Sequence, residues 1–250
     1  MRENIEEIAK EYYRGRFRDY MDSKAEPYSL WMQKRQMHEH KAALLRGAAK
    51  VSVLDVGSGP ITTLGCLLPK TQVELIATDC YADAYNEVLD EFGLDVPVRP
   101  RPIPAKQLFE EFGADRFDLV HCRNALDHMA DPIKCLQVMA SVTKSNGYIW
   151  IDVFSREGSS SGYEEMHQWD VYMGPDGCVM LDGPNLGSPL RLLTVISDVA
   201  DLYKLESFTE DPRIDPATRK LVKGGIKSLH FINDSQVTCG RTIRVILRKR

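Results

Sequence analysis

The chain has 250 residues, of which 43% are hydrophobic and 27% are charged, and 36 acidic against 32 basic residues give a net charge of −4. These values exclude a disordered chain, a collagen-like fibre and a disulfide-rich miniprotein, and they fit a single globular domain. A charge this close to neutral does not favour broad binding to nucleic acid or to a membrane surface.

The cysteines and the hydropathy pattern indicate a reducing compartment. None of the six cysteines forms a Cys-x-x-Cys pair, and most have apolar neighbours, as reduced and packed thiols do. The N-terminal segment is charged from its start, unlike a signal peptide, and no run of about 18 apolar residues predicts a membrane span. We therefore expect a cytoplasmic protein that contacts neither membrane nor nucleic acid. The sequence leaves the oligomeric state open, with a homodimer as one possibility.

Two helices are predicted before the first strand. Residues 2–20 carry apolar side chains at helical spacing, including Ile5, Ile8 and Tyr12. A second helix is expected over residues 30–48. Together they predict an N-terminal helical cap over residues 1–48.

From residue 49 onward, short apolar runs alternate with helical patterns. Strands are predicted at 51–56, 73–79, 117–122 and 148–154, with a weaker one at 97–103. Helices are predicted at 61–69, 82–92, 105–112 and 130–144. This alternation predicts an α/β fold with a mostly parallel sheet and helices on both faces.

The C-terminal part is less regular. A Gly-Pro-Asp-Gly turn starting at Gly174 predicts a hairpin over residues 171–187, which we interpret as an insertion at about 170–190. A helix is expected at 190–202, followed by closing strands at 203–208, 228–232 and 242–247. No linker divides residues 49–250, so they are expected to form one structural domain.

The most informative segment is a glycine turn after the first strand, Val53-Leu-Asp-Val-Gly-Ser-Gly59. Glycines let the backbone approach a ligand closely, and the helix expected next would point its amide groups at that ligand. Thr62 stands where a dinucleotide-binding turn has its third glycine. Asp55 would repel a phosphate, so a cationic or zwitterionic ligand fits better.

A second carboxylate, Asp79, ends the second predicted strand 22 residues after Gly57. An acid at this place accepts hydrogen bonds from a ribose diol. An adenosine ligand with a charged amino-acid tail would therefore satisfy both Asp55 and Asp79.

Over residues 45–155 the sequence resembles the class I S-adenosylmethionine-dependent methyltransferases. The resemblance rests on VLDVGSGP, IATDC, RFDLVHCRNALDHMADP and the strand YIWIDVF, in the family's order. It implies a Rossmann-like domain with a seven-stranded sheet. It also implies S-adenosyl-L-methionine as cofactor and S-adenosylhomocysteine as product.

The resemblance also implies a set of cofactor-binding positions. Asp79 would hold the ribose hydroxyls, and Cys80 would lie beside the adenine. Pro104 replaces an acid that the family often has before the loop edging the adenine ring. The remaining positions would be Asp55, Gly57, Ser58 and Gly59 at the methionine end, Asn124 beneath it, and Ala105 and Lys106 at the adenine edge.

Two histidines are candidate general bases, since imidazole titrates near neutral pH. His128 lies at the start of a predicted helix that Asp131 and Pro132 begin, and its alternative role is to shape the pocket floor. His167 follows the fourth strand, where loops surround the ligand crevice, and it is otherwise a solvated side chain. Trp169 would contact the acceptor or pack in the core.

Further acceptor contacts are proposed for Trp31 and Arg35 on the second helix, together with His38 on the same face, and for Arg123. The alternatives are an amphipathic face packed on the sheet and a surface ion pair. His38 and His40 alone do not make a metal site, and no further ligands stand out, so no metal is expected.

Taken together, the sequence predicts methyl transfer from S-adenosylmethionine to a small-molecule or glycan-like acceptor. The segment after the third strand, Cys122-Arg-Asn-Ala, lacks the Asn/Asp-Pro-Pro-Tyr pattern of enzymes that methylate amide or base nitrogens. Oxygen is therefore placed ahead of nitrogen. The alternatives are a cofactor-binding partner subunit without catalysis and an NAD-type oxidoreductase.

Overall fold

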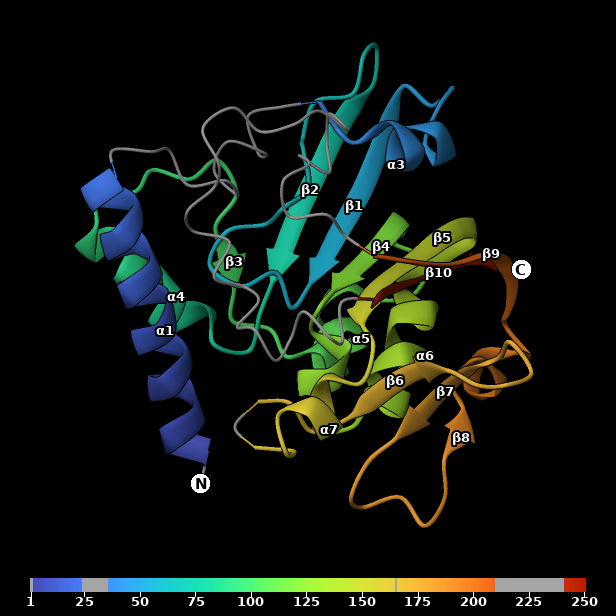
Figure 1. Cartoon of the computed structure of the whole chain (residues 1–250). Coiled ribbons are helices and arrows are strands. Elements are labelled where there is room, and N and C mark those ends of the chain that lie inside the picture. The colour runs from blue at the N-terminus through green and yellow to red at the C-terminus, as the bar shows by residue number, and fades with distance from the viewer. Residues whose placement is uncertain (1, 24–35, 165, 210–240) are drawn as a thin grey trace.

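The computed structural model describes residues 2–23, 36–164, 166–209 and 241–250. In this part of the chain, seven strands form one sheet in the order β3-β2-β1-β4-β5-β10-β9, and β6-β7-β8 form a smaller one (Figure 1). The large sheet consists of β1 (Lys50–Val56), β2 (Gln72–Thr78), β3 (Pro100–Arg101), β4 (Phe117–Arg123), β5 (Thr143–Phe154), β9 (Ala200–Thr209) and β10 (Arg241–Lys249). The small sheet consists of β6 (Asp170–Met173), β7 (Val179–Asp182) and β8 (Leu190–Arg191).

The strand pairing agrees with the predicted α/β fold. β1 pairs in parallel with β2 and β4, and β4 pairs in parallel with β5. β10 runs antiparallel to β5 and to β9, which closes the far edge. All residues of β1 after Lys50 are buried, as expected for a central strand covered on both faces.

The helices cover both faces of the sheet and define separate parts of the core. The largest cluster joins one face to α6 (Pro132–Val142) and to the small sheet. A second cluster places Trp150 of β5 under α3 (Glu39–Leu44). The remaining helices are α1 (Arg2–Ser23), α4 (Ala82–Glu91), α5 (Leu108–Phe112), α7 (Glu157–Ser160) and the 3-10 turns η1 (Ala105–Gln107), η2 (Leu126–His128) and η3 (Leu192–Ile196).

The first predicted cap helix is confirmed, and the second is shorter than expected. α1 runs beside α4 (Figure 1), and Tyr13 packs edge-on against Tyr85 with ring centroids 5.0 Å apart. In the described residues the second helix is only α3, with His38 as its N-cap rather than on its face. Residues 30–35, which include Trp31 and Arg35, lie outside the described residues.

The helix predicted at 61–69 is wrong. Residues 57–71, all of which are described, form an irregular connection with short β-bridges. Pro60, Pro69 and three successive β-branched residues from Ile61 disfavour a helix. The Thr62 hydroxyl accepts a bond from the Leu64 amide, a local contact that competes with helical pairing.

The C-terminal expectations are partly confirmed. The hairpin is present as β6 and β7, and β9 and β10 cover the strands expected at 203–208 and 242–247. The helix predicted at 190–202 is wrong, since this stretch contains β8, η3 and the start of β9. Three successive β-branched residues from Thr194 disfavour an α-helix and lie in η3 instead, where Leu192 and Ile196 are buried in the main core. The strand expected at 228–232 lies outside the described residues.

Among the described helices, none combines the length and the apolar character needed to cross a membrane. Among the described cysteines, Cys80, Cys122, Cys135 and Cys178 form no disulfide bond; Cys122 and Cys135 are buried, whereas Cys80 is exposed.

Candidate functional site

The glycine turn lies where β1 ends, between the ends of β2 and β4. Gly57 has φ +66° and Gly59 has φ +65°, a left-handed conformation that favours glycine. The Gly57 and Ser58 amides donate to the Thr78 carbonyl at 2.8 and 3.1 Å, which fixes the turn to β2. A Cβ atom at Gly57 would lie 2.4 Å from the Ala125 Cβ. The turn is therefore pressed against the segment that follows β4.

Asp79 sits directly beside this turn. Its Oδ2 accepts the Gly59 amide at 2.9 Å, and its Oδ1 accepts the Tyr81 amide at 3.0 Å. Burial raises the pKa of Asp79, and the two amide bonds offset only part of the rise. A carboxylate oxygen can accept more than one hydrogen bond, so both oxygens retain acceptor capacity for a ligand.

Asp55 is buried under the turn and has protein partners on both oxygens. Its Oδ2 accepts the Thr62 hydroxyl, and its Oδ1 lies 2.7 Å from His121 Nδ1. Burial lowers the pKa of His121, and the charge of Lys41 lowers it further, so the neutral ring donates to Asp55 through Nδ1. The contacts of Asp55 in this structure are thus with protein groups, and its expected contact with the methionine end of the cofactor stays a prediction.

The other predicted cofactor positions follow the carboxyl ends of β2, β3 and β4, which is the edge where parallel α/β sheets have their ligand crevice. Cys80 is exposed beside Asp79, and the Asp79 amide donates to the Arg101 carbonyl at 3.0 Å, which brings the end of β3 alongside. Ala105 and Lys106 begin η1 shortly after β3. Asn124 follows β4 with φ +47°, and its side-chain Oδ1 is buried with no hydrogen-bond partner among the described residues.

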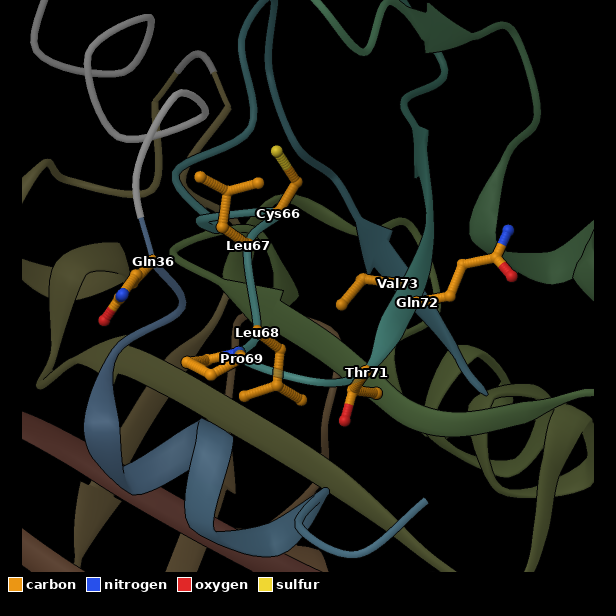
Figure 2. A pocket seen from close by; sticks show the side chains of 8 residues that line it. All are labelled: Gln36, Cys66, Leu67, Leu68, Pro69, Thr71, Gln72 and Val73. Carbon is orange, nitrogen blue, oxygen red and sulfur yellow. The ribbon is translucent and has the colours of Figure 1, made fainter. Parts of the chain in front are cut away.

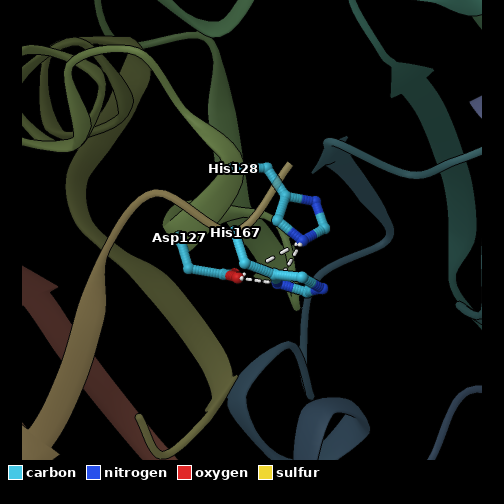
Figure 3. Close-up of side chains that lie close together, drawn as sticks. All are labelled: Asp127, His128 and His167. Carbon is cyan, nitrogen blue, oxygen red and sulfur yellow. Dashed lines mark hydrogen bonds and ion pairs between the residues drawn. The ribbon is translucent and has the colours of Figure 1, made fainter. Parts of the chain in front are cut away.

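Next to this crevice, Asp127, His128 and His167 converge (Figure 3). Asp127 Oδ2 lies 2.8 Å from His167 Nδ1 and 3.2 Å from His128 Nε2, and the two ring nitrogens are 3.1 Å apart. The Asp127 side chain is 1% exposed, whereas those of His128 and His167 are 27% and 23% exposed. A buried carboxylate thus holds two imidazoles that face the solvent side.

Electrostatics tie this cluster together. Burial alone would raise the pKa of Asp127, but the charges and hydrogen bonds of the two histidines hold it well below its usual range. Burial likewise lowers the pKa of His128, but the Asp127 charge and hydrogen bond outweigh it and raise the pKa. Burial raises the pKa of Glu157, which lies 4.0 Å from His167 Nδ1, to about 7.

Backbone contacts position His167 despite its distance along the chain. The Gln168 amide donates to the Asp127 carbonyl at 3.0 Å, and the Trp169 indole N–H donates to the Met129 carbonyl at 2.7 Å. These two bonds join the segment before β6 to η2. Trp169 is 9% exposed and belongs to the main core, which corresponds to the packing alternative.

Two further features, the predicted acceptor contact Arg123 and a surface hollow, lie apart from the cluster of Asp127, His128 and His167. Arg123 ends β4 half-buried and lies near enough to Lys41 to lower the pKa of that lysine, although burial is the larger cause. A hollow of about 460 Å³ lies between Gln36, residues 66–71 and the start of β2 (Figure 2). It is at the opposite end of β2 from Asp79, so it is not the cofactor crevice.

Comparison with known proteins decides the family. The family described as Methyltransferase domain matches residues 28–188, more than half of the chain. The chain belongs to the class I S-adenosylmethionine-dependent methyltransferases. S-adenosylmethionine is its cofactor, and the NAD-type alternative is set aside. No match was found among curated proteins.

One solved structure with a TM-score above 0.5 supports the fold of this methyltransferase, and two others are similar at lower scores. The putative methyltransferase in complex with the Trm112 activator of Haloferax volcanii has a TM-score of 0.52 at 15% identity, covering 98% of this chain and 96% of that one. The YcgJ protein of Bacillus subtilis has a TM-score of 0.48 at 18% identity, covering 85% and 99%. The N-methyltransferase NodS of Bradyrhizobium japonicum, solved with S-adenosylhomocysteine, has 0.48 at 10% identity, covering 84% and 83%.

The crevice of the methyltransferase fits its cofactor chemically. Its glycine turn brings half-buried backbone at Gly57 and Ser58 to this end of the sheet, Asp79 retains acceptor capacity for hydroxyl groups, and Asn124 Oδ1 is a buried acceptor without a described partner. Sequence reasoning placed these positions but not the convergence of Asp127 with His167. Asp127 and His167 are 40 positions apart, and no spacing pattern predicts a contact at that separation. The Asp127-His128 pair after β4 was therefore the only indication of the cluster in the sequence.

Proposed function

We propose that this methyltransferase transfers the methyl group of S-adenosylmethionine to a hydroxyl of a small-molecule or glycan-like acceptor. The observation that carries the proposal is the cluster of Asp127, His128 and His167 beside the cofactor turn. Ala125, which contacts Gly57, is only two residues before Asp127 in the chain. The cluster is therefore close to the place where the methyl group would be offered.

The cofactor-binding roles follow from the crevice. Asp79 would accept the ribose hydroxyls, with Cys80, Ala105 and Lys106 toward the adenine. Asn124, Asp55 and the backbone from Gly57 to Gly59 would hold the methionine part, and Asp55 is itself fixed by the Thr62 hydroxyl. When bound, the cofactor supplies an activated methyl group on a sulfonium centre.

The protein's own contribution is to align the acceptor and to handle its proton. Alignment at close range supplies much of the rate enhancement when the methyl group is already activated. A hydroxyl also has to lose a proton, whereas a neutral amine already has a free lone pair. A histidine base oriented by a buried aspartate suits that need, which is why oxygen is favoured over nitrogen.

The cofactor half of the proposal is tested with Asp79→Ala. Loss of charge-assisted hydrogen bonds to the ribose should weaken S-adenosylhomocysteine binding at least tenfold, or about 1.4 kcal/mol, in calorimetry. Asp83→Ala, an acid in the first turn of α4, is the matched control and should bind normally. Normal binding by Asp79→Ala would remove this residue from the site.

The acceptor half is tested with a panel of phenols, sugars and amines. Methyl transfer to a hydroxyl that falls at least about a hundredfold in His167→Gln, with unchanged S-adenosylhomocysteine binding, is the expected result. Transfer to amines alone would overturn the oxygen preference. Tight cofactor binding without transfer to any acceptor would favour the alternative of a non-catalytic partner subunit.

A further inference from the structure

We infer that Asp127, His128 and His167 form a binding site for one divalent transition-metal ion, such as Zn²⁺. The inference rests on the proposed function and deepens it: with the ion bound, both histidines are ligands, and the ion rather than a histidine base would help the acceptor hydroxyl to lose its proton. The metal binding itself is measured without methyl transfer. It replaces the expectation from sequence that no metal is bound, since three suitable ligands do converge in the structure.

The separations of the three ligand atoms match a single coordination sphere. Asp127 Oδ2, His128 Nε2 and His167 Nδ1 form a triangle with edges of 2.8, 3.1 and 3.2 Å. Ligand atoms about 2.0–2.1 Å from one cation at cis-octahedral or tetrahedral angles are roughly 2.9–3.4 Å apart. Figure 3 shows that all three atoms point toward the same place.

Hydrogen bonds alone leave the three polar atoms of this triangle less well paired than a shared cation would. If both ring nitrogens donate to Asp127 Oδ2, two N–H groups face each other across 3.1 Å. If one nitrogen is unprotonated, the buried carboxylate loses a donor. Asp127 Oδ1 already has no hydrogen-bond partner among the described residues. One cation would accept a lone pair from all three groups at once.

The surroundings provide charge balance and access. Glu157 lies next to the triangle, with its Oε2 buried and without a hydrogen bond in the described part of the chain. Asp127 supplies one negative charge to a divalent ion, and the neighbouring Glu157 carboxyl group is placed to supply the second. The partial exposure of His128 and His167 leaves an approach from solvent and an open coordination position.

The donor set selects the kind of ion. Imidazole and carboxylate ligands with an open position are typical of catalytic zinc and of non-haem iron sites, whereas Mg²⁺ and Ca²⁺ prefer oxygen alone. A hydroxyl at the open position becomes more acidic, as metal-bound water does. The site would therefore favour acceptors that carry a hydroxyl group able to coordinate the ion.

The test is metal binding by the full chain after removal of metal with a chelator. Calorimetry with Zn²⁺ and visible absorption with Co²⁺ should each show one bound ion per chain. His128→Gln and His167→Gln, both at partly exposed positions, should each weaken binding by at least about a hundredfold. Thermal unfolding in chelator should show that both variants remain folded.

His40→Gln is the matched control, because His40 belongs to the other pair of neighbouring histidines and should not change the affinity. A thiolate charge-transfer band in the Co²⁺ spectrum would place the ion on a cysteine and overturn the inference. Absence of stoichiometric binding, or equal binding by the double histidine variant, would also overturn it. The binding of S-adenosylhomocysteine through Asp79 would remain intact in either case, so failure here is distinct from failure of the proposed function.

Discussion

At the scale of single residues, Gly57 has two separate reasons to be glycine. Its φ of +66° strains any L side chain, and an added Cβ atom would meet Ala125 at 2.4 Å. The first reason is the backbone conformation of Gly57 itself, and the second is its close contact with Ala125. Substitution should thus disturb the fold around the turn as well as the approach of the cofactor, which is more than the glycine pattern alone predicts.

Gly57→Ala should lower the free energy of unfolding by about 2–4 kcal/mol and abolish S-adenosylhomocysteine binding, because backbone strain and the clash with Ala125 add. Gly177→Ala separates the two effects, since Gly177 has φ +76° with no atom within 4 Å of the added Cβ. It should cost only about 1 kcal/mol. Urea unfolding and calorimetry measure both, and equal costs would contradict the role of the contact.

At the scale of elements, α1 is attached to the domain through aromatic packing. Phe17 is 3% exposed and lies against Phe92 with ring centroids 6.0 Å apart, whereas Tyr12 on the same helix is 44% exposed. Exposed ion pairs such as Arg14 with Glu91 add little to such an attachment. The aromatic side chains therefore determine whether α1 stays in place.

Phe17→Ala should weaken the docking of α1 by about 3 kcal/mol, because a buried ring is lost from a packed interface. Hydrogen exchange of the α1 amides should then become faster while the amides of β1 stay protected. Tyr12→Ala should leave both unchanged. Simultaneous loss of protection in α1 and β1 would show that the helix is not an independent unit.

The elements also show what sequence patterns can and cannot predict. The buried strands could be predicted because β1, β4 and the second half of β5 are rich in apolar and β-branched residues, and the first helix could be predicted from its spacing. The connection over 57–71 was not, since its apolar residues mimic a helix while Thr62 bonds to Asp55 instead. The helix prediction from Leu190 onward was wrong for a related reason, because a local sequence pattern does not show which residues the core will bury.

At the scale of the whole molecule, the C-terminal strand is tied to the middle of the sheet. Arg244 of β10 donates to both carboxylate oxygens of Asp152 in β5 at 2.8 and 3.1 Å, and both residues are at most 9% exposed. Burial alone would raise the pKa of Asp152, but Arg244 and Lys41 hold it well below its usual range. The pair thus links the last strand to the strand beside the candidate site.

Asp152→Asn should lower the free energy of unfolding at neutral pH by about 3–5 kcal/mol, because it leaves the buried Arg244 without its charge partner. A depressed carboxyl pKa contributes stability above its unfolded value, and this contribution disappears as the pH falls below about 4. The difference between variant and wild type should therefore shrink in acid. Asp90→Asn, in an exposed pair with Arg99, should cost less than about 1 kcal/mol at any pH.

The position of Tyr13 affects how fast the cofactor can bind to and leave the glycine turn. Its hydroxyl lies 2.9 Å from where a Cβ atom of Gly59 would be, so α1 covers this part of the glycine turn. A nucleoside settling on that stretch of backbone has to displace this hydroxyl first. Binding and release of S-adenosylhomocysteine should then both be limited by movement of α1 away from the turn. Phe17→Ala should therefore increase both rate constants in stopped-flow measurements.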